Sequence, residues 1–122
     1  MYKEKDNPLR DKSYAFALVI VKVTSKIQVD KKEYVLSKQL LRSGTSIGAN
    51  VEEAIGGQSN KDFIHKISIA YKEARESHYW IRLLKDSDYI DGELGNELLE
   101  KVEELLRIIT SIQRTMKAKL NS

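Results

Sequence analysis

The chain has 122 residues, a formal net charge of +3, 32% charged and 41% hydrophobic residues, and no cysteine. This composition is typical of a folded globular protein and the length suits one domain, whereas the lack of cysteine excludes disulfides, thiolate metal sites and a cysteine nucleophile. No apolar run approaches the roughly 20 residues that a membrane span needs. The start of the chain mixes both signs of charge and does not resemble a signal peptide. We therefore expect a cytoplasmic protein with a single domain, residues 1–122.

Turn-forming and charged residues divide the chain into four long segments. Asn7 followed by Pro8 is a typical helix start, with asparagine as the N-cap and proline in the first turn. The glycine pair at Gly56 and Gly57 is typical of a helix end. Ser59 can cap the start of a third helix, and Asp91 can cap the start of a fourth. We expect helices at about residues 8–29, 34–55, 59–85 and 93–119.

Periodic spacing of apolar and small residues indicates that these segments are helical. In the third segment, intervals of four and three separate Phe63, Ile67, Ala70, Ala74, Ser77, Ile81 and Leu84. In the fourth segment, the same intervals separate Leu98, Val102, Leu105, Ile109, Ile112 and Met116. Such spacing forms one seam along a helix. Four long helices with short loops predict an all-α fold, an up-down-up-down antiparallel four-helix bundle.

The first helix is apolar on every side between residues 14 and 21. A bundle helix needs only one apolar stripe, so a helix that is apolar all round requires cover on all its sides. It is either a thick core helix in a compact bundle or a helix whose second apolar face packs against another subunit. We favour subunit contact, because four helices cannot readily cover every side of one member.

Two glycines interrupt the second helix. Gly44 and Gly48 lie one turn apart on the same helix face, although each costs about 1 kcal/mol relative to alanine in a helix interior. A close crossing with another helix would offset this cost, because glycine lets two backbones approach. We therefore predict a tight helix crossing at these two residues.

Polar residues form a group beside these glycines. Its members are Arg42, Ser46, Asn50 and Glu53 on the second helix, with Glu73 and Glu76 on the third. The group is either a solvated face or a buried or interfacial network, in which Arg42 pairs with a carboxylate and Asn50 binds backbone groups. The small residues around it favour the network, which would specify helix register more than it would add stability.

Residue patterns for catalysis or metal binding are absent from the sequence. His65 and His78 are thirteen residues apart, and so lie on different faces of the third helix. Neither forms the Glu-x-x-His pair of di-iron bundles, and no phosphate-binding glycine loop or nucleophile elbow occurs. We predict that the chain is not an enzyme and that it holds no metal and no cofactor.

The stretch from Gln39 to Ala54, QLLRSGTSIGANVEEA, resembles the signature of a family of bacterial four-helix bundle proteins. The family was first named from intervening sequences in 23S ribosomal RNA genes, and its usual pattern reads QLxRAxxSIxANIAEG. This chain departs from the pattern at Glu52 and Ala54, where alanine and glycine are usual. Further likeness extends over most of the chain, from about Ser13 to Met116.

The resemblance implies a non-enzymatic bundle that assembles as a ring-shaped pentamer. A related branch, the accessory variability determinants of diversity-generating retroelements, binds nucleic acid and works with a reverse transcriptase. The partners that the resemblance suggests are therefore other copies of the chain, RNA or DNA, and a reverse transcriptase. The alternative is a protein-interaction scaffold with no role in nucleic-acid binding.

Basic residues are the candidates for contact with nucleic-acid phosphates. They are Lys22, Lys26, Lys38, Arg42, Arg114, Lys117 and Lys119. Arg42 also belongs to the polar group, which can hold it inside the fold. The basic end of the last helix has a second explanation, because cations near a helix C-terminus suit the helix dipole. One chain at +3 has a weak field, but five copies would carry about +15.

Overall fold

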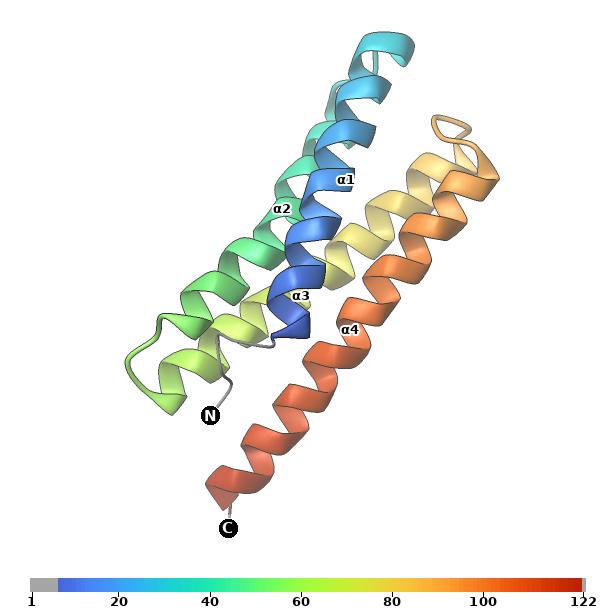
Figure 1. The fold of residues 1–122 in the computed structure, drawn as a ribbon. Coiled ribbons are helices and arrows are strands. Elements are labelled where there is room, and N and C mark those ends of the chain that lie inside the picture. Colours follow the sequence, from blue (N-terminus) through green and yellow to red (C-terminus); the bar gives the residue numbers. More distant parts are fainter. Residues whose placement is uncertain (1–6, 122) are drawn as a thin grey trace.

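Four α-helices form the fold in the computed structural model, which describes residues 7–121 (Figure 1). They are α1 (Pro8–Lys31), α2 (Val35–Ile55), α3 (Asn60–Asp86) and α4 (Gly92–Asn121). Each observed end lies within two residues of the expected one. No strand occurs within this part of the chain, so the all-α expectation is confirmed. None of the helices described is long and apolar enough to cross a membrane. The mixed-charge start, residues 1–6, lies outside the described residues.

Side-chain caps define the start of three helices. Asn7, Ser59 and Asp91 each accept a hydrogen bond from the backbone N–H three residues further on, at 2.9, 3.1 and 2.7 Å respectively. These bonds satisfy N–H groups that have no partner inside the helix. All three are residues that the sequence marks as caps, which explains the agreement between expected and observed helix starts.

Glu33 caps the start of α2, a role that the sequence analysis does not predict. Its two carboxylate oxygens accept hydrogen bonds from the backbone N–H groups of Val35, Leu36 and Ser37, at 3.0, 2.9 and 2.8 Å. Burial raises the pKa of Glu33, but these hydrogen bonds together outweigh it and lower the pKa below its ordinary value. Lys32, at φ 56°, turns the chain through the left-handed region. The α1–α2 connection is thereby held in a defined conformation.

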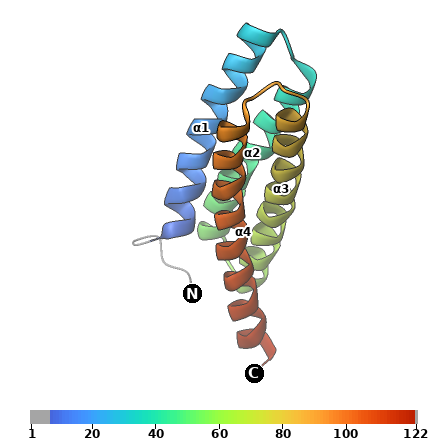
Figure 2. The same ribbon diagram turned by 90° about the vertical axis from the view of Figure 1, so that its right-hand side faces the viewer.

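Consecutive helices run antiparallel, and α2 and α3 form the most extensive contact (Figure 1, Figure 2). α1 and α4 make the smallest contact of the neighbouring pairs, and Figure 1 shows them diverging toward the α1–α2 connection. Every residue of the two predicted seams is buried except Ile112, which is partly buried. The largest fully buried side chains include Phe16, Ile20, Leu40, Ile47, Phe63, Ile67, Ile81, Leu84, Leu98, Leu105 and Ile109.

The outer face of α1 is uncovered in the single chain. Tyr14, Leu18, Val21 and Val29 are 65%, 50%, 48% and 67% exposed, whereas Phe16 on the opposite side of the helix is buried. The four exposed residues follow one side of the helix because their spacings are close to whole numbers of turns. We call them the α1 outer stripe. The helix is therefore apolar on two faces, of which the bundle covers one.

Candidate functional site

Gly44 and Gly48 lie where α2 crosses α1. A Cβ atom at Gly44 would lie 2.9 Å from Cγ2 of Ile20, too close to be accommodated without a shift. At Gly48 the nearest atom would be the backbone oxygen of Ser13 at 3.4 Å, which is close to an ordinary contact. The predicted glycine pair thus has unequal members, and the close approach depends mainly on Gly44.

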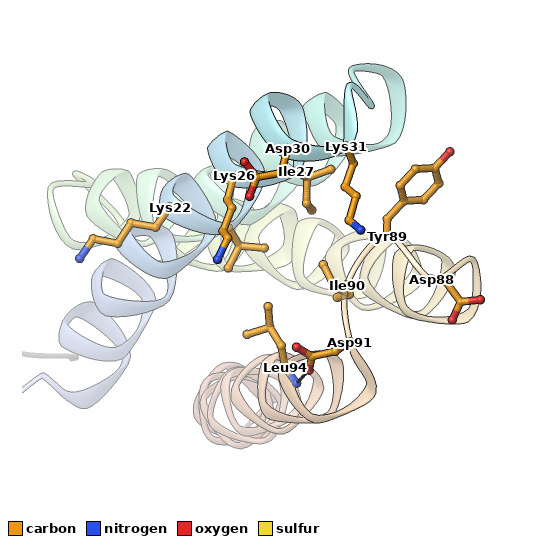
Figure 3. A pocket seen from close by; sticks show the side chains of 11 residues that line it. Lys22, Lys26, Ile27, Asp30, Lys31, Asp88, Tyr89, Ile90, Asp91 and Leu94 are labelled. Carbon is orange, nitrogen blue, oxygen red and sulfur yellow. Dashed lines mark hydrogen bonds between the residues drawn. The ribbon is translucent and has the colours of Figure 1, made fainter.

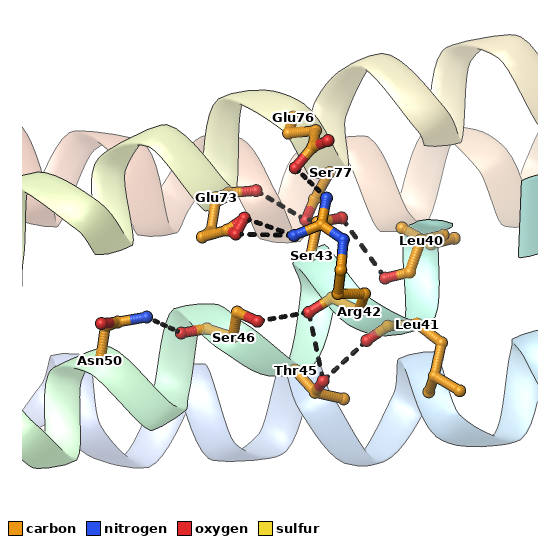
Figure 4. A network of polar contacts seen from close by, with 10 residues as sticks. All are labelled: Leu40, Leu41, Arg42, Ser43, Thr45, Ser46, Asn50, Glu73, Glu76 and Ser77. Carbon is orange, nitrogen blue, oxygen red and sulfur yellow. Dashed lines mark hydrogen bonds and ion pairs between the residues drawn. The ribbon is translucent and has the colours of Figure 1, made fainter. Parts of the chain in front are cut away.

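Arg42 of α2 joins two carboxylates of α3 (Figure 4). Its Nη1 donates to both oxygens of Glu73, at 3.0 and 3.1 Å, and its Nη2 donates to Glu76. The hydrogen bond from Arg42 lowers the pKa of Glu76, while hydrogen bonds to Glu76 and Glu73 raise the pKa of Arg42. The Arg42 side chain is 50% exposed and that of Glu73 is 14% exposed. This cluster therefore lies at the surface of the single chain.

The remaining members of the predicted polar group do not join this cluster. Ser46 donates to the backbone oxygen of Arg42 at 2.6 Å, and Asn50 donates to that of Ser46 at 2.8 Å (Figure 4). Both side chains bind their own helix, because short polar side chains reach the carbonyl oxygen four residues back. Glu53 instead pairs with Lys66 of α3 at 2.7 Å. The group is divided into the arginine–glutamate cluster, a separate α2–α3 ion pair of Glu53 and two contacts within α2.

A buried pair of serines lies next to the cluster. Ser43 of α2 and Ser77 of α3 are fully buried, with their hydroxyl oxygens 2.9 Å apart. Ser77 also donates to the backbone oxygen of Glu73 at 2.8 Å. The sequence signal for this contact is a serine in an otherwise apolar seam. Its partner depends on how α2 aligns with α3, which the spacing within one helix does not specify.

The predicted phosphate-binding residues lie in two groups at opposite ends of the bundle. Near the α1–α2 connection lie Lys22, Lys26 and Lys38, all exposed. Near the C-terminal end of α4 lie Arg114, Lys117 and Lys119 (Figure 1). The three lysines of the first group make no ion pair with any described residue. The seventh candidate, Arg42, is engaged by Glu73 and Glu76, so one chain does not bring the seven residues to one surface.

A cavity of about 460 Å³ opens where α1 and α4 diverge (Figure 3). Its aliphatic lining consists of Val23, Ile27, Ile90 and Leu94. Its charged lining consists of Lys22, Lys26, Asp30, Lys31, Asp88 and Asp91. Asp91 is already engaged in the cap of α4. The lining carries both signs of charge and has no paired nucleophile and base, so its geometry does not indicate catalysis.

The two histidines lie apart on α3. His78 Nε2 is 3.0 Å from Glu103 Oε2 of α4, and His65 is exposed. Among residues 7–121, no group of three or more histidine and carboxylate side chains could hold a metal ion.

These features define a four-helix bundle with a close α1–α2 crossing and an interhelical arginine–glutamate cluster. The chain belongs to the 23S rRNA-intervening sequence protein family, whose model matches residues 5–111. It is similar to a solved structure, a protein of unknown function from the S23 ribosomal protein family of Bacteroides thetaiotaomicron VPI-5482. That match has 44% sequence identity, covers 87% of this chain and 95% of the other, and has a TM-score of 0.85. No curated protein matches the chain at a significant level.

Family membership confirms the resemblance that the signature stretch indicates. The departures from the signature at Glu52 and Ala54 can also be located in this structure. Glu52, where alanine is usual, pairs with Arg10 of α1 at 2.9 Å on the surface, and Ala54, where glycine is usual, is buried in the core. Neither the family's description nor that of the solved structure names an enzymatic activity.

Proposed function

We propose that this chain is a non-enzymatic subunit of a cytoplasmic homo-oligomer, a pentamer as the family resemblance implies, and that the assembly binds RNA or DNA through exposed basic residues. One observation supports both parts of the proposal. The surface of α1 combines an uncovered apolar stripe with lysines that have no carboxylate partner among the described residues. The proposal requires no metal and no cofactor.

The α1 outer stripe supports self-association. Complete burial of a large apolar side chain stabilises by about 1.5–3 kcal/mol relative to full exposure, and roughly half of that applies to each of the four stripe residues, which are 48–67% exposed in the single chain. Tyr14, Leu18 and Val21 follow one another at spacings of about one turn, and large contiguous apolar patches on a soluble protein usually mark an interface. Covering the stripe would therefore contribute several kcal/mol toward the cost of bringing two chains together.

The lysines near the α1–α2 connection support binding to a phosphate backbone. Lys22, Lys26 and Lys38 are exposed, and no described carboxylate pairs with them. Phosphate contacts position nucleic acid without reading its sequence, so the binding would tolerate many sequences. An assembly repeats these contacts once in each copy, which raises the local positive charge well above that of one chain.

A mobility-shift titration with labelled RNA and DNA at two salt concentrations tests the binding. We expect retardation at about 50 mM salt and much weaker retardation at about 200 mM, because each neutralised phosphate releases counterions. The double variant Lys22→Glu, Lys26→Glu should weaken binding to every sequence without changing helix content. Absence of retardation by the unaltered chain at about 50 mM salt, where such contacts are strongest, would refute the binding proposal.

The second candidate function is a protein-interaction scaffold with no nucleic-acid role. The α1 outer stripe favours it as well, because a different protein could cover that apolar face instead of a second copy. A reverse transcriptase is the protein partner that the family resemblance suggests. A chain that remains a monomer and does not retard nucleic acid would favour the scaffold over the first proposal.

A further inference from the structure

We propose that the corner where α1 meets α2 binds single-stranded nucleic acid, with lysines holding phosphates and Tyr34 stacking on a base. We call this corner, residues 30–38, the α1–α2 tip. The inference rests on the nucleic-acid binding proposed above, and adds its location and the form of nucleic acid that it takes. Charge, aromatic exposure and backbone geometry at the tip each support it.

The tip and the last turns of α1 carry a concentrated positive charge. Residues 22–38 contain five lysines and two carboxylates, an excess of +3 that equals the net charge of the whole chain. All five lysines are exposed, and none pairs with a carboxylate in residues 7–121, unlike Lys12, which bonds to Glu104, or Lys66, which bonds to Glu53. The five are Lys22, Lys26, Lys31, Lys32 and Lys38.

The two carboxylates of this segment do not cancel that charge equally. Glu33 accepts three backbone N–H groups at the start of α2, so its negative charge is offset by the positive end of the helix. Asp30 makes no ion pair with a described lysine. Asp30, Asp88 and Asp91 line the same cavity as Lys22, Lys26 and Lys31, whereas Lys32 and Lys38 lie outside that lining. The positive charge of the corner is therefore least opposed at Lys32 and Lys38.

Exposed ring and aliphatic surface lies among these lysines. Tyr34 is 47% exposed, and the next residue, Val35, is 70% exposed. An aromatic ring between cations is the arrangement that proteins use for single strands, because every base has a face on which a ring can stack. In a duplex the base faces are covered by neighbouring bases, so a ring at the surface can stack only on an unpaired base.

The backbone on both sides of Tyr34 is held in a defined conformation. Tyr34 immediately follows Glu33, whose hydrogen bonds hold the first turn of α2, and Lys32 adopts a left-handed turn on the other side. A short connection with these restraints loses little further freedom when it binds a ligand, and such preorganisation favours affinity. The site is thus built by the same contacts that cap α2.

Fluorescence anisotropy with a labelled single-stranded oligonucleotide of about 12 nucleotides, and with its duplex, tests the inference. We expect the single strand to bind the unaltered chain more tightly than the duplex at about 50 mM salt. Tyr34→Ala should weaken single-strand binding at least about fivefold, the factor that corresponds to the lower end of measured base-stacking energies. Tyr34→Phe should bind as the unaltered chain does, because the ring face remains.

Matched variants separate stacking and charge from unfolding. Tyr79→Ala removes another exposed tyrosine, 53% exposed on α3, and should leave binding unchanged. Tyr34→Leu keeps apolar bulk without an aromatic face and should weaken binding as alanine does. The double variant Lys31→Glu, Lys38→Glu should weaken binding of the single strand and of the duplex. The control double variant Lys61→Glu, Lys72→Glu on α3 changes the net charge by the same amount and should have a smaller effect. Circular dichroism verifies that each variant remains helical.

Two results would overturn the inference, and they can be told apart. If the unaltered chain binds no nucleic acid, the proposed function fails and the tip inference fails with it. If the unaltered chain binds nucleic acid, only the tip inference fails in either of two cases. In one, Tyr34→Ala and Tyr34→Leu bind the single strand as tightly as the unaltered chain; in the other, the unaltered chain binds the duplex as tightly as the single strand. Where the chain binds no nucleic acid, binding of vesicles of phosphatidylglycerol and phosphatidylcholine at the tip would assign the lysines and Val35 to a lipid surface instead.

Discussion

At Gly44, the absence of a side chain sets how closely two helices approach. A Cβ there would lie 2.9 Å from Ile20, whereas one at Gly92 would have nothing within 4 Å. The spacing of Gly44 and Gly48 predicts a crossing but does not show which glycine is essential. That difference depends on which α1 atom faces each glycine, and hence on the register of the two helices.

The substitution Gly44→Leu should destabilise the fold although leucine is the better helix former. Overpacking a tight contact costs typically about 1–3 kcal/mol, which exceeds the roughly 1 kcal/mol gained in helix propensity over most of that range. Urea unfolding would measure the change in the free energy of unfolding. Gly92→Leu, placed in open space, is the matched control and should be close to neutral. A more stable Gly44→Leu variant would show that the crossing is loose.

Glu33 should make the stability of the fold depend on pH at acidic values. The pKa of Glu33 is lower in the folded chain than in the unfolded chain. Glu33 therefore stabilises the fold fully at pH values above its unfolded pKa of about 4.3, and this stabilisation is lost as the pH falls through its folded pKa. Glu33→Ala should cost about 1 kcal/mol at pH 7, as the loss of a helix cap does.

The difference between Glu33→Ala and the unaltered chain should shrink as the pH falls below about 4, because the protonated carboxyl is a weaker acceptor. Urea unfolding at pH 7 and at about pH 3 would measure both values. Glu97→Ala, at an exposed position on α4, is the control and should show a smaller cost at pH 7. A cost for Glu33→Ala that is equal at both pH values would contradict the charged cap.

At the scale of the helix, α1 has an apolar face that packing within the bundle does not cover. Phe16 and Ile20 pack into the core, while Leu18 between them is half exposed. The all-round apolar sequence correctly predicts an uncovered face. It does not indicate which residues form that face, because periodicity gives no preferred side in a run where every position is apolar. The packing of α2 and α4 against α1 decides it.

Leu18→Glu should separate assembly from folding. The position is half exposed in the single chain, so a charge there leaves the bundle folded but would be buried in an interface without a partner, at high cost. We expect unchanged helix content by circular dichroism and a smaller particle by size-exclusion chromatography with light scattering. Ile20→Glu, at a fully buried position, should instead unfold the chain. Retention of the large particle by Leu18→Glu would place the interface elsewhere.

At the scale of the whole molecule, helix starts and seams are predictable from the sequence, and interhelical contacts are not. Helix caps and the spacing of apolar residues are local features of the sequence. Asn7, Ser59 and Asp91 can therefore be recognised as caps without knowledge of the packed bundle. The partners of Arg42 and Ser43 lie more than thirty residues away on α3, and only the packed bundle brings them together. The same reason explains why six of the seven basic candidates, chosen by charge alone, fall at two ends of the molecule, and why the seventh, Arg42, pairs with carboxylates of α3.

The central claim is that another copy of the chain covers the α1 outer stripe, and the mass of the particle in solution tests it most directly. Sedimentation equilibrium of the unaltered chain at micromolar concentration should give a mass well above the 14.0 kDa of one chain. A pentamer would give about 70 kDa, five times the mass of the chain. A single species of 14.0 kDa at that concentration would contradict the claim and leave the α1 outer stripe without a partner of its own kind.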